Sequence, residues 1–190
     1  MDYREDGLLI HIKNLFPICR SITGEGLIQT AEYFKRFHPE YKTIKYRTGE
    51  RVFDWVIPLV WNIKNAYLEH IDSGTRYCEF KKNNLHVVGY SKPIETVMSL
   101  EKLQEKLYTL PKQPNLIPYI TSYYKEDWGF CLSEEEKKRM RPGNYKVKID
   151  SKLEKGYLNI NHLIIKGKLK QEIFFSSYIC HPSMANNELS

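Results

Sequence analysis

The chain has 190 residues, of which 42% are hydrophobic and 27% are charged, and its formal net charge is +6. No apolar run approaches the roughly 20 residues needed to cross a bilayer, and the first residues lack a signal-peptide pattern, so we expect a cytoplasmic protein that does not enter a membrane. Lysine and arginine are spread along the chain among acidic residues, without a recognised motif, which argues against a nucleic-acid partner. The four cysteines contain no Cys-x-x-Cys pair, so neither a disulfide framework nor a Cys-rich zinc site is expected.

Two amphipathic helices are predicted at the start of the chain. Apolar residues at helical spacing favour a helix from about Asp6 to Cys19, with Asp6 as its N-cap and Pro17 near its end. The same spacing predicts a second helix from about Leu27 to Phe37.

The turn between these helices carries polar side chains directly before a helix N-terminus. Free backbone N–H groups and the helix dipole favour an anion there, so Arg20, Ser21 and Thr23 are candidate substrate contacts for a carboxylate or phosphate. A glycine-rich turn with hydroxyl caps is also an ordinary helix connection, and no phosphate-loop lysine follows it. Both interpretations stay open.

From residue 41 the chain changes character. Short runs rich in β-branched and aromatic residues, separated by turn signals, predict a small mainly-β unit. The predicted strands are 43–46, 52–61, 66–71, 77–80 and 85–90. A helix capped by Ser99 is expected from Leu100 to about Tyr108, followed by a stiff proline-bearing connection.

The aromatic side chains of this unit either line a ligand wall or form its core. The core is favoured, because a unit this small needs large side chains to bury enough area. The residues concerned are Phe53, Trp55, Trp61, Tyr67 and Tyr77.

Strands return at the end of the chain. After a short extended segment at 119–124 and a charged helix capped by Ser133, strands are predicted at 145–150, 156–165 and 173–180. The first two alternate polar and apolar residues, which is typical of an antiparallel pair at a sheet edge. The third is apolar on both faces apart from two serines, which favours a buried strand of a sheet covered on both sides.

His181 directly follows this third strand. Ligands and metals gather outside the carboxyl ends of strands in α/β sheets, so His181 is a candidate metal ligand. By pattern alone, a lone histidine at a strand end is more often a structural, hydrogen-bonded residue than a ligand. Cys180 is its neighbour, but adjacent side chains of a strand point to opposite faces, so a Cys–His catalytic pair is not expected there.

Four blocks along the chain resemble a bacterial aminopeptidase-like family. They are Cys19-Arg-Ser-Ile-Thr-Gly-Glu-Gly26, Asp54-Trp-Val-Ile-Pro58, Ser122-Tyr-Tyr-Lys-Glu-Asp-Trp-Gly-Phe-Cys131 and Tyr178-Ile-Cys-His-Pro-Ser-Met-Ala-Asn-Asn187. That family is a domain of unknown function within the di-zinc aminopeptidase superfamily, loosely associated with polysaccharide biosynthesis.

The resemblance implies an α/β fold, with a zinc-aminopeptidase-like mixed sheet, flanking helices and a small inserted mainly-β domain. On that basis residues 1–40 are the first helices of the peptidase-like domain, 41–115 the inserted domain, and 116–190 the first strands and metal loop. The later strands, ligands and general base would lie beyond this chain, so no catalytic residue is assigned.

The resemblance also implies a metal site. One or two zinc ions would be held by His181, Asn187 and Glu188, and the intact protein would hydrolyse an amide bond of a peptide or related small substrate. The sequence departs from the family at Asn187, where a carboxylate is expected to bridge the metals, and at Ser183, where one is expected to orient the ligand.

These departures keep a second hypothesis open: a non-catalytic binding protein of the same fold, recognising a peptide or amino sugar in polysaccharide biosynthesis. A third is an anion- or nucleic-acid-binding domain, recognisable by salt-dependent affinity. A homo-oligomer is compatible with each of them.

Overall fold

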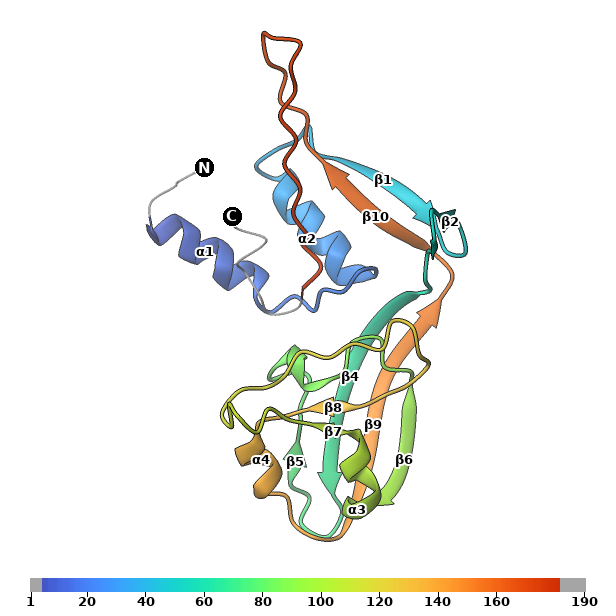
Figure 1. The fold of residues 1–190 in the computed structure, drawn as a ribbon. Helices are drawn as coiled ribbons and strands as arrows, with labels where there is room; N and C mark the ends of the chain where they lie inside the picture. Colours follow the sequence, from blue (N-terminus) through green and yellow to red (C-terminus); the bar gives the residue numbers. More distant parts are fainter. Residues whose placement is uncertain (1–4, 182–190) are drawn as a thin grey trace. The chain divides into compact units, whose positions relative to one another are not determined.

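The computed structural model describes residues 5–181, which form two compact units (Figure 1). Unit 1 contains the described residues up to Val60 and those from Lys155 onward, and unit 2 is the continuous stretch from Trp61 to Glu154. The described chain is a mixed α/β structure with small sheets and few helices. The domain boundaries expected near residues 41 and 115 differ from the limits of these units.

Two helices open unit 1. They are α1 (Glu5–Leu15) and α2 (Glu25–Lys35), close to the ranges that the apolar spacing predicts. Asp6 lies inside α1, so the expectation that it caps the helix is wrong. α2 begins after Gly24, whose φ of 98° lies in the left-handed region that glycine adopts without steric cost.

A two-stranded antiparallel sheet follows, built from segments far apart in the chain. β1 (Lys42–Arg47) pairs with β10 (Tyr157–His162), and Ile44 lies opposite Ile160. The sequence predicts instead that the strand at 156–165 pairs with the one at 145–150, and this pairing is wrong. Gly156 explains the choice of partner: its carbonyl accepts from the Thr48 N–H at 3.0 Å and its own N–H donates to Thr48 Oγ1 at 3.1 Å, so the ladder to β1 continues beyond β10.

A short hairpin completes the strands of unit 1. β2 (Arg51–Val52) pairs with β3 (Trp55–Val56), so the single strand predicted over 52–61 is broken by a tight turn. Phe53 lies in that turn with φ 55°, a left-handed conformation that is uncommon for a bulky residue, and its side chain is 93% exposed. The expectation that Phe53 belongs to a core is therefore wrong.

Unit 2 is built on a four-stranded sheet with the order β5-β4-β9-β6. The strands are β4 (Val60–His70), β5 (Arg76–Tyr77), β6 (Ile94–Ser99) and β9 (Asn144–Glu154). In β9 the alternate side chains of Tyr145, Val147 and Ile149 are buried, which is the period of two that the sequence predicts. One face of this sheet therefore supplies much of the core.

Short helical turns and a second pair of strands accompany the sheet. These elements are η1 (Asn84–His86), α3 (Leu100–Leu103), η2 (Gln104–Lys106), β7 (Leu107–Tyr108), β8 (Phe130–Cys131) and α4 (Glu134–Lys138). β7 and β8 are parallel. Ser133 caps α4 as predicted, because its hydroxyl accepts from the Glu136 N–H at 3.0 Å. η1 replaces the start of the strand predicted at 85–90, because the Asn83 side chain accepts from the Leu85 N–H at 3.0 Å and begins a helical turn.

The core of unit 2 is a cluster of buried apolar side chains from the four-stranded sheet and from the short elements that accompany it. Its members are Ala66, Leu68, Tyr77, Cys78, Val87, Leu103, Leu107, Trp128, Phe130, Leu132, Met140, Tyr145, Val147 and Ile149. Tyr77 is thus a core residue, as expected. Trp61 is buried as well, and its indole N–H donates to the Ser91 carbonyl at 2.9 Å.

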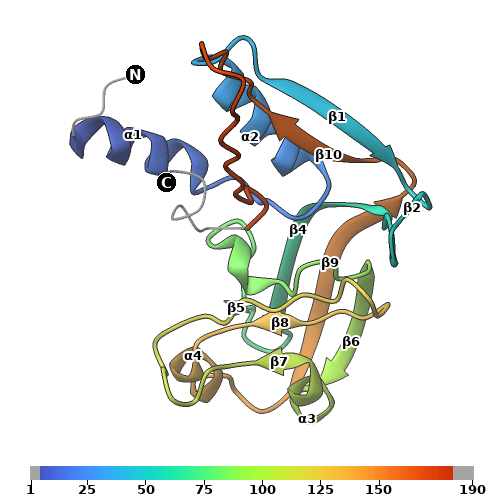
Figure 2. The ribbon, with the colours of Figure 1, turned by 45° about the horizontal axis from the view of Figure 1, so that its top comes forward.

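The last described segment, 163–181, contains neither helix nor strand. Figures 1 and 2 draw it as a loop that leaves β10, turns back on itself and returns toward the connection between α1 and α2, where His181 meets Arg20. The buried strand predicted at 173–180 is wrong for this structure, since Phe174 and Phe175 are 89% and 88% exposed. The reason is that a strand needs a neighbour for its backbone hydrogen bonds, and among residues 5–181 no strand pairs with this segment.

Candidate functional site

Arg20 joins two parts of unit 1 that lie far apart in the sequence. Its side chain is 1% exposed, in the connection between α1 and α2. One terminal nitrogen, Nη1, donates to the Leu15 carbonyl at 2.5 Å, and Nε donates to the His181 carbonyl at 3.0 Å. The structure therefore brings together two of the residues singled out in the sequence, through a side chain and a backbone oxygen.

Ser21 and Thr23 are also buried. The Ser21 hydroxyl donates to the Thr23 carbonyl at 3.2 Å, and the Thr23 N–H lies 3.5 Å from Ser21 Oγ. These contacts fold the chain into a compact turn before α2. Both hydroxyl-bearing residues thus help to shape the turn that carries Arg20.

Gly26 allows this turn to lie against the start of α2. A Cβ atom at Gly26 would come within 1.9 Å of the Cys19 carbonyl oxygen and 3.2 Å of Arg20 Cα. Both neighbours are backbone atoms, which cannot rotate away as a side-chain end does. Glycine is therefore required at position 26 if the backbone at Cys19 and Arg20 is to keep its conformation.

The residues expected to bind zinc are described only in part. His181 is half-buried at the end of the described chain, whereas Asn187 and Glu188 lie outside the described residues. Within residues 5–181, no three His, Cys, Asp or Glu side chains gather into a group that could hold a metal ion. The described residues therefore offer His181 as a single expected donor and do not by themselves form a zinc site.

Cys19 lies beside Arg20 but is not poised as a nucleophile. Burial raises the pKa of its thiol to about 12, and the neighbouring Arg20 charge lowers that pKa only in part. At pH 8 a thiol with this pKa is ionised in about one molecule in ten thousand, against a sizeable fraction for a free cysteine. Cys19 therefore lacks the thiolate that a covalent mechanism requires.

We expect Cys19 to react with iodoacetamide at pH 8 roughly a thousand times more slowly in the folded protein than in urea, since only the thiolate attacks. Peptide mapping by mass spectrometry after timed labelling measures both rates. Cys131, whose pKa burial also raises to about 12, serves as a second slow thiol. Equal labelling of Cys19 in folded and unfolded protein would contradict a protonated, half-buried thiol.

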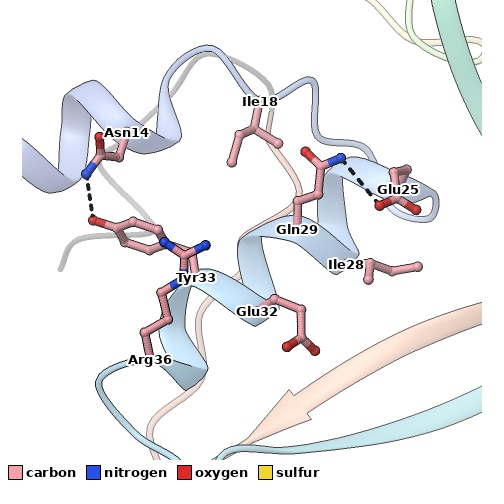
Figure 3. Close-up of a pocket in the computed structure, with 8 residues that line it drawn as sticks. All are labelled: Asn14, Ile18, Glu25, Ile28, Gln29, Glu32, Tyr33 and Arg36. Atoms are coloured by element: carbon pink, nitrogen blue, oxygen red, sulfur yellow. Dashed lines mark hydrogen bonds between the residues drawn. The ribbon is translucent and has the colours of Figure 1, made fainter.

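A cavity of about 460 Å³ opens between α1 and α2 (Figure 3). It is lined by Asn14, Ile18, Glu25, Ile28, Gln29, Glu32, Tyr33 and Arg36. Asn14 Nδ2 donates to the Tyr33 hydroxyl at 3.2 Å, and Gln29 Nε2 donates to Glu25 Oε1 at 3.3 Å. The arrangement places carboxylates and one guanidinium around the same hollow.

The sequence does not single out this cavity. Glu25, Gln29, Glu32 and Arg36 recur at spacings of three and four residues, which is the ordinary pattern of a solvated helix face. The hollow arises from how α1 lies against α2, where His11 Nδ1 and the Tyr33 hydroxyl are 2.6 Å apart. No sequence signal distinguishes that packing.

Part of the chain matches a known protein family. Residues 60–152 match the family described as a domain of unknown function (DUF2172). These limits nearly coincide with unit 2. No described helix is both long enough and apolar enough to cross a membrane.

A curated protein of Clostridium acetobutylicum is 44% identical over 179 residues, covering 94% of this chain and 41% of its own length. It is provisionally named a polysaccharide biosynthesis protein with an aminopeptidase-like domain. A crystal structure from the same organism, provisionally named a peptidase, is 43% identical and has a TM-score of 0.91 over 97% of this chain and 43% of its own. The chain thus spans about two fifths of the length of each protein. Along almost all of its own length it is similar to one protein named for an aminopeptidase-like domain and to one named as a peptidase.

Proposed function

We propose that the intact protein is an aminopeptidase-like metallohydrolase that cleaves an amide bond of a peptide or related small substrate, and that this chain carries part of its site. The names of the similar proteins support a hydrolase of this kind. The observation that carries the proposal is the contact between Arg20 and the backbone of His181. In this proposal unit 1 belongs to the zinc-aminopeptidase-like mixed sheet and its helices, and unit 2 is the inserted domain.

Burying the Arg20 guanidinium costs free energy, so the hydrogen bonds that compensate for it are informative. A guanidinium remains protonated, and removing it from water requires compensating hydrogen bonds. Arg20 gives such bonds to carbonyls in both chain segments of unit 1, those of Leu15 and His181. Holding the carbonyl of His181 fixes the backbone from which its imidazole projects, as a metal ligand requires.

His181 is the proposed ligand within the described residues, and Asn187 and Glu188 are the proposed further ligands. A bound zinc ion polarises a carbonyl and lowers the pKa of a water ligand to about 7. Asn187 contributes a carbonyl oxygen without charge, so Glu188 would supply the negative charge that a dication favours. The role of Arg20, Ser21 and Thr23 as substrate contacts stays a prediction. In this proposal their buried side chains set the position of His181 and of the adjoining turn.

The test is zinc binding by the intact protein, measured by elemental analysis and by competition with a chromogenic chelator. We expect His181→Ala to lose bound zinc, and Arg20→Lys to weaken zinc binding by about 10- to 100-fold, because the ligand remains but its backbone is less firmly held. His38→Ala, at a half-buried surface position of unit 1, is the matched control and should bind zinc as the unaltered protein does. Unchanged zinc content in His181→Ala would remove the ligand role.

A second candidate function is a non-catalytic binding protein of the same fold, acting on a peptide or amino sugar. The uncharged Asn187 favours it, since the resemblance implies a bridging carboxylate at that position. Hydrolysis of aminoacyl p-nitroanilides by the zinc-loaded protein separates the two candidates. Turnover that is lost in His181→Ala supports the hydrolase. A folded protein that takes up no zinc when zinc is supplied, and shows no turnover, supports the binding protein.

A further inference from the structure

Unit 2 carries a chain of aromatic rings that runs from its interior to its surface. The Trp61 ring stacks on Tyr90, with centroids 5.8 Å apart and planes 19° apart. Tyr90 in turn meets the edge of Tyr123 at 4.9 Å, and Tyr123 lies 6.4 Å from Tyr124 at 82°. The first two rings are buried, whereas the Tyr124 side chain is 86% exposed.

The outer rings form a surface that we call the tyrosine platform, consisting of Tyr119, Tyr123 and Tyr124. The hydroxyls of Tyr119 and Tyr123 lie 3.1 Å apart. Tyr119 is also exposed, and Tyr123 is half-buried between the platform and the interior. Because the Tyr124 ring projects into solvent, the core of unit 2 does not account for its presence.

The platform is held on a fixed backbone. The Gly89 N–H donates to the Ile120 carbonyl at 2.8 Å, and the Ser122 N–H donates to the Gly89 carbonyl at 2.8 Å. These two hydrogen bonds fix the backbone on both sides of Thr121, in the segment that carries the platform. Rings held in place lose little conformational freedom when a ligand binds.

The backbone beneath the platform is strained. Tyr90 has φ 65°, a left-handed conformation that costs a residue with a side chain about 1–2 kcal/mol. Ser91 holds this conformation: its buried hydroxyl donates to the Val88 carbonyl at 2.6 Å and accepts from the Gly129 N–H at 3.3 Å. Strain that the surrounding structure maintains is concentrated at functional sites.

The charges beside the platform are paired with one another. Lys125 Nζ lies 3.1 Å from Asp127 Oδ2, and Lys92 Nζ lies 3.5 Å from Glu126 Oε1. Asp127 also pairs with Lys106 Nζ at 2.5 Å, so three lysines share two carboxylates and the excess is a single positive charge. With so little charge in excess, the aromatic rings decide the choice of ligand, and the platform suits a neutral ligand better than an anion or a cation.

The area of the platform points to a small ligand. A tyrosine ring buries at most about 150–250 Å², and only Tyr124 is almost fully exposed, whereas a stable protein interface takes about 800 Å² from each partner. A sugar ring fits these dimensions and this chemistry, because its C–H face packs on an aromatic face while its hydroxyls bond to phenolic hydroxyls at the rim.

We propose that the tyrosine platform of unit 2 binds a neutral oligosaccharide, with a sugar ring stacked on Tyr124 and its hydroxyls meeting those of Tyr119 and Tyr123. This site deepens the second candidate function and does not depend on the metal ligands of the first. It gives unit 2 a role of its own, as the part of the protein that holds a glycan chain.

The test is titration of the intact protein with maltotetraose, cellotetraose and N-acetylchitotetraose, followed by ligand-observed NMR and calorimetry. We expect millimolar binding of at least one of them, weakened about tenfold by Tyr124→Ala and largely retained by Tyr124→Phe, which keeps the ring. Tyr157→Ala, at an exposed tyrosine of unit 1, is the matched control and should bind as the unaltered protein does.

Three outcomes would overturn the proposal: no binding of any of the three sugars, binding that Tyr124→Ala leaves unchanged, or binding of a proline-rich peptide in place of the sugars. Circular dichroism of each variant checks that the fold is retained. Sugar binding measured in His181→Ala separates this site from the metal site, because the platform should bind equally well when the proposed zinc ligand is absent.

Discussion

Replacing Phe130 with alanine is expected to lower the free energy of unfolding of unit 2 by about 3–5 kcal/mol, because it removes a large side chain from a closed core. Phe130 is 0% exposed and belongs to the buried cluster, where its ring meets the edge of Trp128 at a centroid distance of 6.5 Å. Its strand, β8, pairs with β7 over only two residues, so few backbone contacts are available to close the space left behind.

Urea unfolding followed by tryptophan fluorescence measures this loss, since Trp61 and Trp128 both lie in unit 2. Tyr124→Ala is the control within the same unit, and removal of its exposed ring should change the unfolding free energy by no more than about 0.5 kcal/mol. A loss below about 1 kcal/mol for Phe130→Ala would mean that this part of the cluster is loosely packed or refills easily.

The parts of the fold that the sequence predicts well are those set by neighbours along the chain. The two helices of unit 1 show their apolar spacing within a few turns, and the cap of α4 depends on Ser133 and a residue three positions later. The buried face of β9 follows from strict alternation. In each case the signal and the structure that it specifies occupy the same short stretch.

The pairing of strands is different, because it is decided between distant segments. The turn at Lys155 and Gly156 favours a local hairpin between β9 and β10, yet Gly156 bonds to Thr48, which is 108 residues away. The apolar pattern of 173–180 has the same weakness. It indicates a stretch suited to burial on both faces, but it cannot supply the neighbouring strands that would cover it.

The candidate site could be predicted only as a set of residues. The sequence identifies Arg20 and His181 separately, one for its place before a helix and the other for its place after an apolar run. Their contact joins a side chain to a backbone carbonyl 161 positions away, and residue types carry no information on such an acceptor. Asn187 and Glu188 lie outside the described residues, so their role as ligands stays a prediction.

Gly26→Ala is expected to destabilise unit 1 by about 1–3 kcal/mol, even though alanine is the better helix former. Gly26 lies in the first turn of α2, where helix propensity alone would predict a gain of about 1 kcal/mol from the substitution. The added Cβ would lie 1.9 Å from the Cys19 carbonyl oxygen, so the backbone of the turn has to move. The sign of the change in unfolding free energy therefore shows whether helix propensity or the clash with the Cys19 carbonyl is the larger effect.

The displacement of the backbone at Cys19 should also alter the contact that Arg20 makes with His181. Cys19 precedes Arg20, so displacing its carbonyl shifts the guanidinium that donates to the His181 carbonyl at 3.0 Å. We expect Gly26→Ala to make the segment 163–181 more susceptible to limited proteolysis, read out by mass spectrometry, besides lowering the denaturation midpoint. Gly167→Ala is the matched control, because a Cβ there would meet nothing within 4 Å, and it should change neither measurement. A stabilised Gly26→Ala protein with unchanged cleavage would show that the turn yields freely and that Arg20 does not hold His181 through it.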